Sequence, residues 1–290
     1  MSIGTFFGSD QGIGGRVTLM GLPFDHGSEA PSGCSLGPSV LRQLSNKWSL
    51  KEKPIVSVEE GKVKLAPGDL SDIGDLQFRV QIGINRYLES ISDISAEFAL
   101  QGRPFLFIGG DHLATLGTIR GLARSVPEFD VIQIDAHSDC GEIPVGQNPT
   151  HANFIYEVIK LKQVRRVLQI GLRGYEQPRD SESGKIIRAS ERDLNEKLDR
   201  NVPVFLTVDS DGFDPIFLQA VNFPVHGGLT LERFKNLCER LELSGVPILG
   251  ADWMEYNPNA DTSNKTSAHF ILGCLIELLA ILKVNGGRKL

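Results

Sequence analysis

Three short stretches of the chain hold closely spaced carboxylates and imidazoles, the groups that commonly bind metal ions. They are Gly109-Gly110-Asp111-His112, Asp135-Ala136-His137-Ser138-Asp139 and Asp209-Ser210-Asp211-Gly212-Phe213-Asp214-Pro215. In an extended segment, residues two apart point to the same side, so the carboxylates and the imidazole of the second stretch can converge. The third stretch repeats this spacing with two aspartates. Together the stretches offer ligands for two metal ions, which indicates a metallohydrolase.

The charge of this ligand set indicates how many ions it holds. Four aspartates at one point would repel one another, and several would take up protons unless cations compensated them. Two divalent cations balance four carboxylates, whereas a single ion would not. Oxygen and nitrogen ligands without a thiolate favour Mn²⁺ over a structural zinc ion. The predicted cofactor is therefore two Mn²⁺ per chain, held by His112, Asp135, His137, Asp139, Asp209 and Asp211.

A plainer interpretation is that these residues only form turns and caps after strands, where Asp and Gly are common. For one motif alone, the two interpretations have similar weight. Three motifs that each follow an apolar run are harder to explain as turns, so we prefer the metal site.

The elements that would position these residues alternate between strands and helices. Apolar runs predict strands at 17–24, 104–108, 131–135, 166–170, 204–209 and 247–251, and helical patterns predict helices at 82–101, 112–125, 231–244 and 267–284. This alternation predicts an α/β fold with a mainly parallel sheet covered on both faces. Residues 1–290 are expected to form one domain. A (β/α)8 barrel is the alternative, because its length is similar.

Nearly every polar cluster lies where a predicted strand ends. Asp111 and His112 follow the second strand, Asp135 and Asp209 end the third and fifth, and Glu255 follows the last. In parallel sheets the carboxyl ends of the strands share one edge, where ligands bind. Clusters far apart in the sequence are therefore expected to lie close together in space.

Bulk properties exclude several classes of protein. The 290 residues carry a net charge of only −6, so no basic surface for nucleic acid is expected. The longest apolar stretch, residues 270–284, contains Glu277 and falls short of the roughly 20 residues of a membrane span. No signal peptide is evident at the start of the chain, and the four cysteines form no Cys-x-x-Cys pair. We expect a cytoplasmic protein that binds a small molecule, not a nucleic acid or a membrane.

The three motifs, taken together, identify the chain as resembling the ureohydrolase family, which includes arginase, agmatinase, guanidino-acid hydrolases and formimidoylglutamase. Weaker matches follow in the family's order and span nearly the whole chain: Gly21-Leu22-Pro23-Phe24-Asp25, Gly37-Pro38, Asp72-Ile73-Gly74-Asp75, Gly171-Leu172-Arg173-Gly174, Gly227-Gly228-Leu229-Thr230 and Glu255-Tyr256-Asn257-Pro258. The resemblance implies a three-layer α/β/α sandwich, a binuclear Mn²⁺ site and a homo-oligomer, either a trimer or a hexamer.

The resemblance also assigns roles to the ligands. One metal would take His112, Asp135, Asp139 and Asp209, and the other would take His137, Asp135, Asp209 and Asp211, so that Asp135 and Asp209 bridge the two ions. A hydroxide between the metals would attack the carbon of a guanidinium or formimino group and release urea or formamide. Asp139 could also orient that hydroxide.

Two further residues match catalytic positions of the family. Glu255 matches the glutamate that pairs with the substrate guanidinium, and a carboxylate suits that planar cation. His151 matches a loop histidine that moves protons, and its residue type fits this work near pH 7. The plain alternatives are a capping glutamate and an ordinary loop histidine. The family usually has His-Gly where this chain has His151-Ala152-Asn153, a departure that can reshape the pocket.

The substrate is less defined by the sequence. The loop around His151 and the segment containing Phe223 both differ from arginase, which argues against arginine and leaves agmatine, a guanidino acid or an unusual amidine. Expected substrate contacts are Glu255, His151, Asn153, Phe223 and Glu176. Two other functions remain open: a metal-dependent amide hydrolase resembling deacetylases, and a family member that lost activity and acts as a binding protein.

Overall fold

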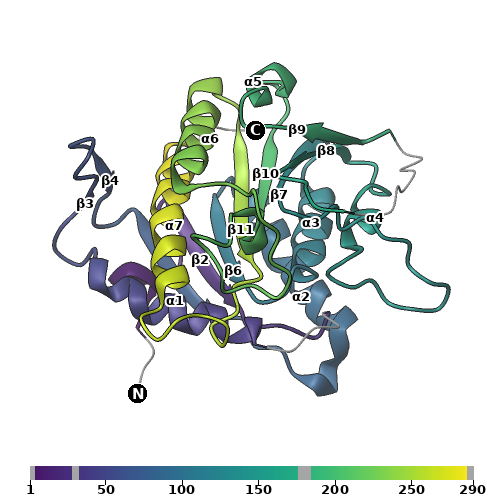
Figure 1. Cartoon of the computed structure of the whole chain (residues 1–290), viewed down its shortest axis with the longest axis horizontal. Coiled ribbons are helices and arrows are strands. Elements are labelled where there is room, and N and C mark those ends of the chain that lie inside the picture. The colour runs from purple at the N-terminus through teal and green to yellow at the C-terminus, as the bar shows by residue number, and fades with distance from the viewer. Residues whose placement is uncertain (1–3, 28–32, 176–183, 286–290) are drawn as a thin grey trace.

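The centre of the molecule is a nine-stranded sheet in which all paired neighbours run parallel (Figure 1). A computed structural model describes residues 4–27, 33–175 and 184–285. Within these residues the strand order is β1-β5-β2-β6-β11-β10-β7-β8-β9. The strands are β1 Asp10–Gln11, β2 Val17–Leu22, β5 Leu70–Asp75, β6 Phe105–Gly109, β7 Phe129–Ile134, β8 Val164–Ile170, β9 Ile186–Ala189, β10 Val204–Asp209 and β11 Ile248–Met254.

Helices cover both faces of this sheet and produce three layers (Figure 1). On one face lie α1 (Gly37–Ser45), α6 (Leu231–Ser244) and α7 (Thr266–Asn285), which pack into one apolar cluster with the sheet. On the other face α2 (Gly83–Leu100), α3 (Ala114–Ser125) and α4 (Phe154–Val158) form a second cluster. Because both faces are covered, the central strands β6, β7, β10 and β11 are buried along their whole length.

The predicted three-layer α/β/α fold is confirmed, and the barrel alternative is wrong. The described sheet does not close, because it begins at β1 and ends at β9. All six predicted strands and all four predicted helices are present, with ends that shift by up to three residues. The largest shift is in β11, which continues to Met254 and brings Glu255 directly after the strand.

Several short elements were not predicted. Strands β1 and β9 form the two edges of the sheet and β5 lies between β1 and β2, and their short or mixed sequences give little apolar signal. A separate antiparallel pair, β3 (Ile55–Val56) and β4 (Val63–Leu65), projects from the body of the molecule (Figure 1). The short helix α5 (Leu194–Lys197) also lacked a clear pattern.

Helix α7 is apolar enough to cross a membrane by length and composition, with a mean hydropathy of 1.9 over Thr266–Val284. In this fold 61% of that stretch is buried inside the molecule. Its side chains Ile271, Leu275, Leu278 and Leu282 are buried in the core cluster shared with α1 and α6. The apolar character of α7 is therefore used for packing against the sheet.

Candidate metal centre

Three of four neighbouring strands deliver the predicted metal ligands to one edge of the sheet, and the fourth, β11, carries Glu255 there. In the order β6-β11-β10-β7 these strands lie side by side, although they are far apart in the chain. His112 follows β6, Asp135, His137 and Asp139 follow β7, and Asp209 ends β10 just before Asp211. Parallel strands bring all their carboxyl ends to the same edge, which explains why these six side chains meet.

The backbone before His112 packs too tightly for any side chain. A Cβ built on Gly110 would lie 1.7 Å from the carbonyl oxygen of Phe24. The amide of Gly110 donates to Leu22, and the amide of Asp111 donates to Phe24 at 2.7 Å. This close approach explains the glycine of the first motif. The Asp111 carboxylate is not a ligand, because it accepts the amides of Gly27 and Leu113 instead.

One group of four buried side chains surrounds His112. The ligand atoms of His112, Asp135, Asp139 and Asp209 all lie within 4.8 Å of one another. His112 Nδ1 is 3.0 Å from Asp209 Oδ2 and 3.3 Å from the Oδ2 atoms of Asp135 and Asp139. It meets none of them with hydrogen-bond geometry, and this buried nitrogen finds no such partner in the described part of the chain.

A second group shares Asp135 with the first. It consists of Asp135, His137 and Asp211, whose ligand atoms also lie within 4.8 Å of one another. His137 Nδ1 is 3.0 Å from Asp211 Oδ2 and 3.7 Å from Asp135 Oδ1. Asp209 was predicted to bridge the two ions, and this role stays a prediction; its carboxylate lies in the first group. Its Oδ1 accepts the amide of Asp211 at 2.8 Å, and its Oδ2 faces His112.

Burial and the neighbouring charges shift the pKa values of several side chains in the two groups. Burial raises the pKa of Asp209 well above its usual range, and burial together with the Asp135 charge raises the pKa of Asp211 to about 6. The hydrogen bond that the His137 ring donates to the Asp211 carboxylate raises the pKa of His137 to about 9. Burial lowers the pKa of His112, but three carboxylates outweigh that effect and raise it well above the usual value. Divalent cations would replace protons on these side chains, since metal ligands must be deprotonated.

The donor set fits two divalent cations. It contains four carboxylates and two imidazoles in two groups that share one carboxylate. A buried imidazole nitrogen that points at three carboxylate oxygens without a hydrogen bond is suited to share a cation with them. Oxygen and nitrogen donors favour ions such as Mn²⁺.

Side chains behind the ligands orient them. His112 Nε2 lies 2.7 Å from Thr207 Oγ1, which leaves Nδ1 directed at the carboxylates. The Gln133 amide donates to Asp135 at 2.8 Å and to Asp139 at 3.3 Å. Such outer partners fix a ligand's tautomer and direction. The sequence analysis missed both residues, although each is polar, lies in an apolar strand, and precedes a ligand by two positions on the same face.

Glu255 lies beside the ligand cluster, in agreement with its predicted position. Its Oε1 accepts the amide of His112 at 2.8 Å, and its Oε2 lies 3.5 Å from Cys34 Sγ. The side chain is 5% exposed. Glu255 has a φ of 63° and Asp139 a φ of 48°, values in the left-handed region that cost about 1–3 kcal/mol for such residues. Strain of this kind is typical of functional sites.

His151 and Phe223 lie next to one another at this site. His151 Nδ1 is 3.3 Å from Glu255 Oε1, and the His151 amide donates to Gly27. The Phe223 ring lies 5.7 Å from the His151 ring and 6.5 Å from the His137 ring, between ring centroids. Phe223 is 45% exposed, so part of its ring faces solvent while the ring lies near both histidines.

Asn153 and Glu176 were also predicted to contact the substrate. Asn153 is buried, and its Oδ1 accepts the amide of Thr150 at 2.6 Å, so this atom stabilises the loop that carries His151. Its predicted contact with substrate stays a prediction. Glu176 lies outside the described residues.

Arg173 connects the turn at residues 209–213, which carries the predicted ligands Asp209 and Asp211, to the segment that contains Phe223. Its guanidinium donates to the carbonyl oxygens of Asp211 and Phe213 on one side and of Val225 and His226 on the other. Burial lowers the pKa of Arg173. The Gly171-Leu172-Arg173-Gly174 motif was noted in the sequence, but this role depends on contacts that no sequence pattern encodes.

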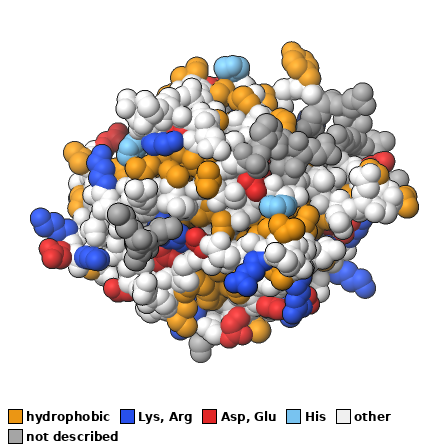
Figure 2. Space-filling model, turned by 90° about the horizontal axis from the view of Figure 1, so that it is seen from below, with side chains coloured by type: hydrophobic (Ala, Val, Ile, Leu, Met, Phe, Trp, Pro, Cys, Tyr) orange, Lys and Arg blue, Asp and Glu red, His pale blue; other side chains and the backbone are white. Residues whose placement is uncertain are grey.

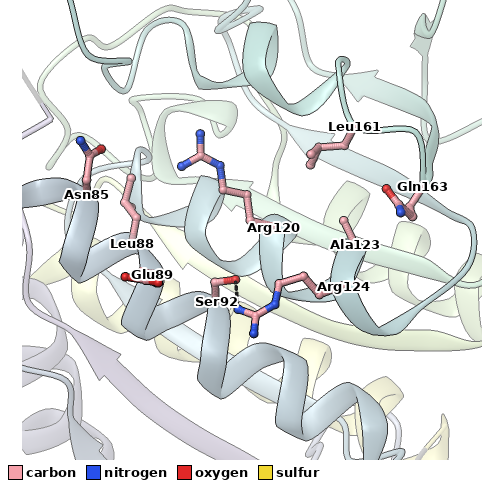
Figure 3. A pocket seen from close by; sticks show the side chains of 9 residues that line it. All are labelled: Asn85, Leu88, Glu89, Ser92, Arg120, Ala123, Arg124, Leu161 and Gln163. Atoms are coloured by element: carbon pink, nitrogen blue, oxygen red, sulfur yellow. Dashed lines mark hydrogen bonds between the residues drawn. The ribbon is translucent and has the colours of Figure 1, made fainter.

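One further face and one cavity of the molecule are shown in Figures 2 and 3. On the face shown in Figure 2, acidic and basic side chains are scattered among apolar ones, without a broad area of one sign. A surface cavity of about 480 Å³ lies between α2 and α3 (Figure 3). Arg124 there donates to Ser92 and Asp93, so its charge is already compensated. None of the predicted site residues lines this cavity.

The fold and this cluster define an α/β protein with a carboxylate–histidine site at the carboxyl edge of its sheet. Residues 15–280 match the arginase family. Arginase 2 of Arabidopsis thaliana, chloroplastic/mitochondrial, is 28% identical over 290 residues, which cover 92% of this chain and 82% of that protein. The guanidinopropionase of Pseudomonas aeruginosa is 29% identical over 296 residues, which cover 94% of this chain and 89% of that protein.

A solved structure has the same fold. The proclavaminate amidino hydrolase of Streptomyces clavuligerus matches with a TM-score of 0.81, covers 98% of each chain, and is 23% identical. Since the family match spans most of the sequence, the chain belongs to the arginase family. The resemblance inferred from the motifs is thereby confirmed.

Proposed function

We propose that this chain is a Mn²⁺-dependent hydrolase that cleaves a C–N bond of a small guanidino or formimino compound and releases urea or formamide. The observation that carries the proposal is the place of Glu255. Its buried carboxylate adjoins the ligand cluster through the amide of His112 at 2.8 Å. A carboxylate there suits a planar cation, because guanidinium can donate two parallel hydrogen bonds to it.

The names of related proteins support the same class of substrate. The guanidinopropionase of Pseudomonas aeruginosa is one relative. Its substrate is a guanidino acid by name, which agrees with the agmatinase or guanidino-acid hydrolase type proposed here. Two bound Mn²⁺ ions would lower the pKa of a water molecule and so provide hydroxide near neutral pH.

The chain's own residues would carry out the remaining work. Glu255 binds the cationic end of the substrate and orients its carbon toward the ligand cluster. His151, 3.3 Å from Glu255, is placed to donate a proton to the leaving nitrogen. Asp139 accepts a proton or a hydrogen bond from the attacking water. Phe223, whose ring lies near both histidine rings, would limit the space beside them and so select substrates by shape.

The test is a panel assay on purified protein loaded with Mn²⁺. Agmatine, arginine, 3-guanidinopropanoate, 4-guanidinobutanoate and formiminoglutamate are supplied separately, and urea, formamide and ammonia are measured. We expect turnover of at least one guanidino or formimino compound and its loss in Glu255→Gln. Glu277→Gln is the matched control, because Glu277 is also buried and pairs with Lys64 at 2.8 Å outside the site. Absence of all three products would refute the proposal.

The same assay addresses the other functions. Hydrolysis of acetylated polyamines that survives Glu255→Gln would indicate an amide hydrolase resembling deacetylases. Binding of a guanidino compound without turnover would indicate a binding protein.

We also propose a cytoplasmic homo-oligomer, either a trimer or a hexamer, whose partners are small molecules rather than nucleic acid or membranes. Light scattering of the purified protein tests the assembly.

A further inference from the structure

A buried cysteine lies against the carboxylate that we expect to bind substrate. Cys34 Sγ is 3.5 Å from Glu255 Oε2, a distance within hydrogen-bond range for sulfur. Cys34 is 1% exposed and lies 221 positions from Glu255 in the sequence. The sequence analysis treated Cys34 as one of four scattered cysteines, so its proximity to the site is a finding of the structure.

The contact belongs to a chain of hydrogen bonds that all run in one direction. The Asn257 side-chain amide donates to Asn222 Oδ1 at 2.8 Å, and the Asn222 amide donates to Cys34 Sγ at 3.5 Å. The thiol of Cys34 then donates to Glu255 Oε2. Asn222 directly precedes Phe223, so this relay connects the segment at the entrance with the carboxylate inside.

The Cys34 thiol is suited to donate a hydrogen bond and unsuited to react as a nucleophile. Burial and the Glu255 charge raise the pKa of Cys34 far above its usual range, so the sulfur keeps its proton. A protonated thiol supplies a weak donor to an ionised carboxylate. A thiolate would instead repel Glu255, and burial disfavours that form.

The segment that carries Cys34 is held firmly in place. The Asp25 carboxylate accepts the amide of Gly33 at 2.9 Å and the Ser35 hydroxyl at 2.8 Å. A Cβ built on Gly33 would lie 2.3 Å from Asn257 Oδ1, so the backbone packs directly on the first member of the relay. Movement of Cys34 away from Glu255 would therefore disturb several bonds at once.

We propose that Cys34 is a positioning residue that fixes Glu255 for substrate binding through the relay Asn257–Asn222–Cys34–Glu255. Glu255 Oε1 is held by the His112 amide, and Cys34 holds the other oxygen. With both oxygens oriented, the carboxylate can present its remaining lone pairs to a planar cation. This inference rests on the proposed function, because it deepens the role given there to Glu255.

The kinetic test compares three variants with the wild type, using agmatine, 3-guanidinopropanoate and 4-guanidinobutanoate as substrates. In Cys34→Ala we expect KM to rise about tenfold, because a bond to a charged acceptor is lost, while kcat stays within about twofold. Cys34→Ser restores a donor and should return KM to within about threefold of the wild type. Cys274→Ala is the matched control, since Cys274 is equally buried but lies in α7.

A purely structural role would give another pattern. Cys34→Ala and Cys274→Ala would then lower the melting temperature alike and leave KM unchanged, and that result would overturn the proposal. Failure of Cys34→Ser to improve on Cys34→Ala in KM would overturn it as well.

A spectroscopic test works without turnover and so separates this inference from the proposed function. The infrared S–H stretching band of Cys34 is identified by subtracting the Cys34→Ala spectrum from that of the wild type. A thiol that donates to a carboxylate absorbs at a lower frequency than one that does not. We expect Glu255→Gln to shift this band upward. An unchanged band would overturn the relay, whether or not the wild type releases urea.

Discussion

The clearest quantitative prediction concerns the hydroxyl behind His112. Thr207 lies in β10, and its Oγ1 is 2.7 Å from His112 Nε2. Thr115 Oγ1 lies 3.4 Å from the same hydroxyl and donates to Asp252 at 2.8 Å, so the imidazole is backed by a buried polar group of three side chains. Replacement of Thr207 by Val keeps the shape of the side chain and removes the partner of Nε2.

The structure gives the size of the effect. His112 and Thr207 are 1% and 0% exposed, so water cannot replace the lost partner. A buried group left without its hydrogen bond costs about 1–3 kcal/mol. Loss of an outer partner of a metal-binding histidine lowers metal affinity about 10–100-fold. The two ranges agree, because each factor of ten corresponds to about 1.4 kcal/mol.

The assay is calorimetric titration of metal-free protein with Mn²⁺. We expect Thr207→Val to weaken one binding step about 10–100-fold and to leave the step at His137 nearly unchanged. Thr18→Val is the matched control, because Thr18 is a buried strand threonine whose hydroxyl faces Ser71 at 3.4 Å instead. Equal Mn²⁺ affinities in the two variants would refute the reasoning.

Three further predictions concern stability and the walls of the site. Arg165 donates a hydrogen bond to the Asp130 carboxylate at 2.8 Å, and Asp130→Asn removes the charge of that carboxylate. We expect this variant to lower the free energy of unfolding by about 2 kcal/mol in urea titrations and to leave Mn²⁺ affinity unchanged. Gly110→Ala places a methyl group 1.7 Å from the Phe24 oxygen, so we expect little soluble protein in expression trials. Arg173→Ala releases several carbonyl oxygens, and limited proteolysis should then cut faster within residues 219–226.

Each of these three variants has a matched control substitution elsewhere in the protein. Asp93→Asn disturbs an exposed pair with Arg124 and should leave the free energy of unfolding within about 0.5 kcal/mol of the wild type. Gly14→Ala adds a methyl group with nothing within 4 Å and should express normally. Arg16→Ala alters an exposed arginine and should not change proteolysis. A variant of the first set that behaves like its control would contradict the corresponding prediction.

The sequence predicted the central part of the fold because its signals there are local and repeated. Helix α6 was placed at 231–244, the bounds the structure has, since Thr230 caps its first turn and Gly245 ends it in the left-handed region. Strand β10 was also placed correctly, because its apolar run is interrupted only by Thr207 before the aspartates begin. The edge strands β1 and β9 escaped prediction, since partly exposed strands lack such runs.

For the site, the sequence could predict which residues meet but not what lies behind them. Strand-end position and the family motifs pointed to the six candidate metal ligands, Glu255 and His151, and the structure brings these side chains together. The partners Thr207, Gln133 and Cys34 belong to no motif, and their roles depend on side-chain packing between distant segments. The strained backbone of Asp139 and Glu255 could not be predicted either, because no glycine marks these positions.

The contacts of Arg173 affect which residues of this protein can be replaced during evolution. Within the described part of the chain, the Arg173 guanidinium bonds only backbone carbonyl oxygens, among them those of Asp211, Phe213 and Val225. Every amino acid supplies such an oxygen, so the attachment does not depend on which side chains the entrance segment carries. Residues such as Phe223 can therefore be exchanged while their backbone stays anchored. An attachment that does not depend on side chains allows the segment around Phe223 to vary in sequence while its backbone stays fixed beside Asp211 and Phe213.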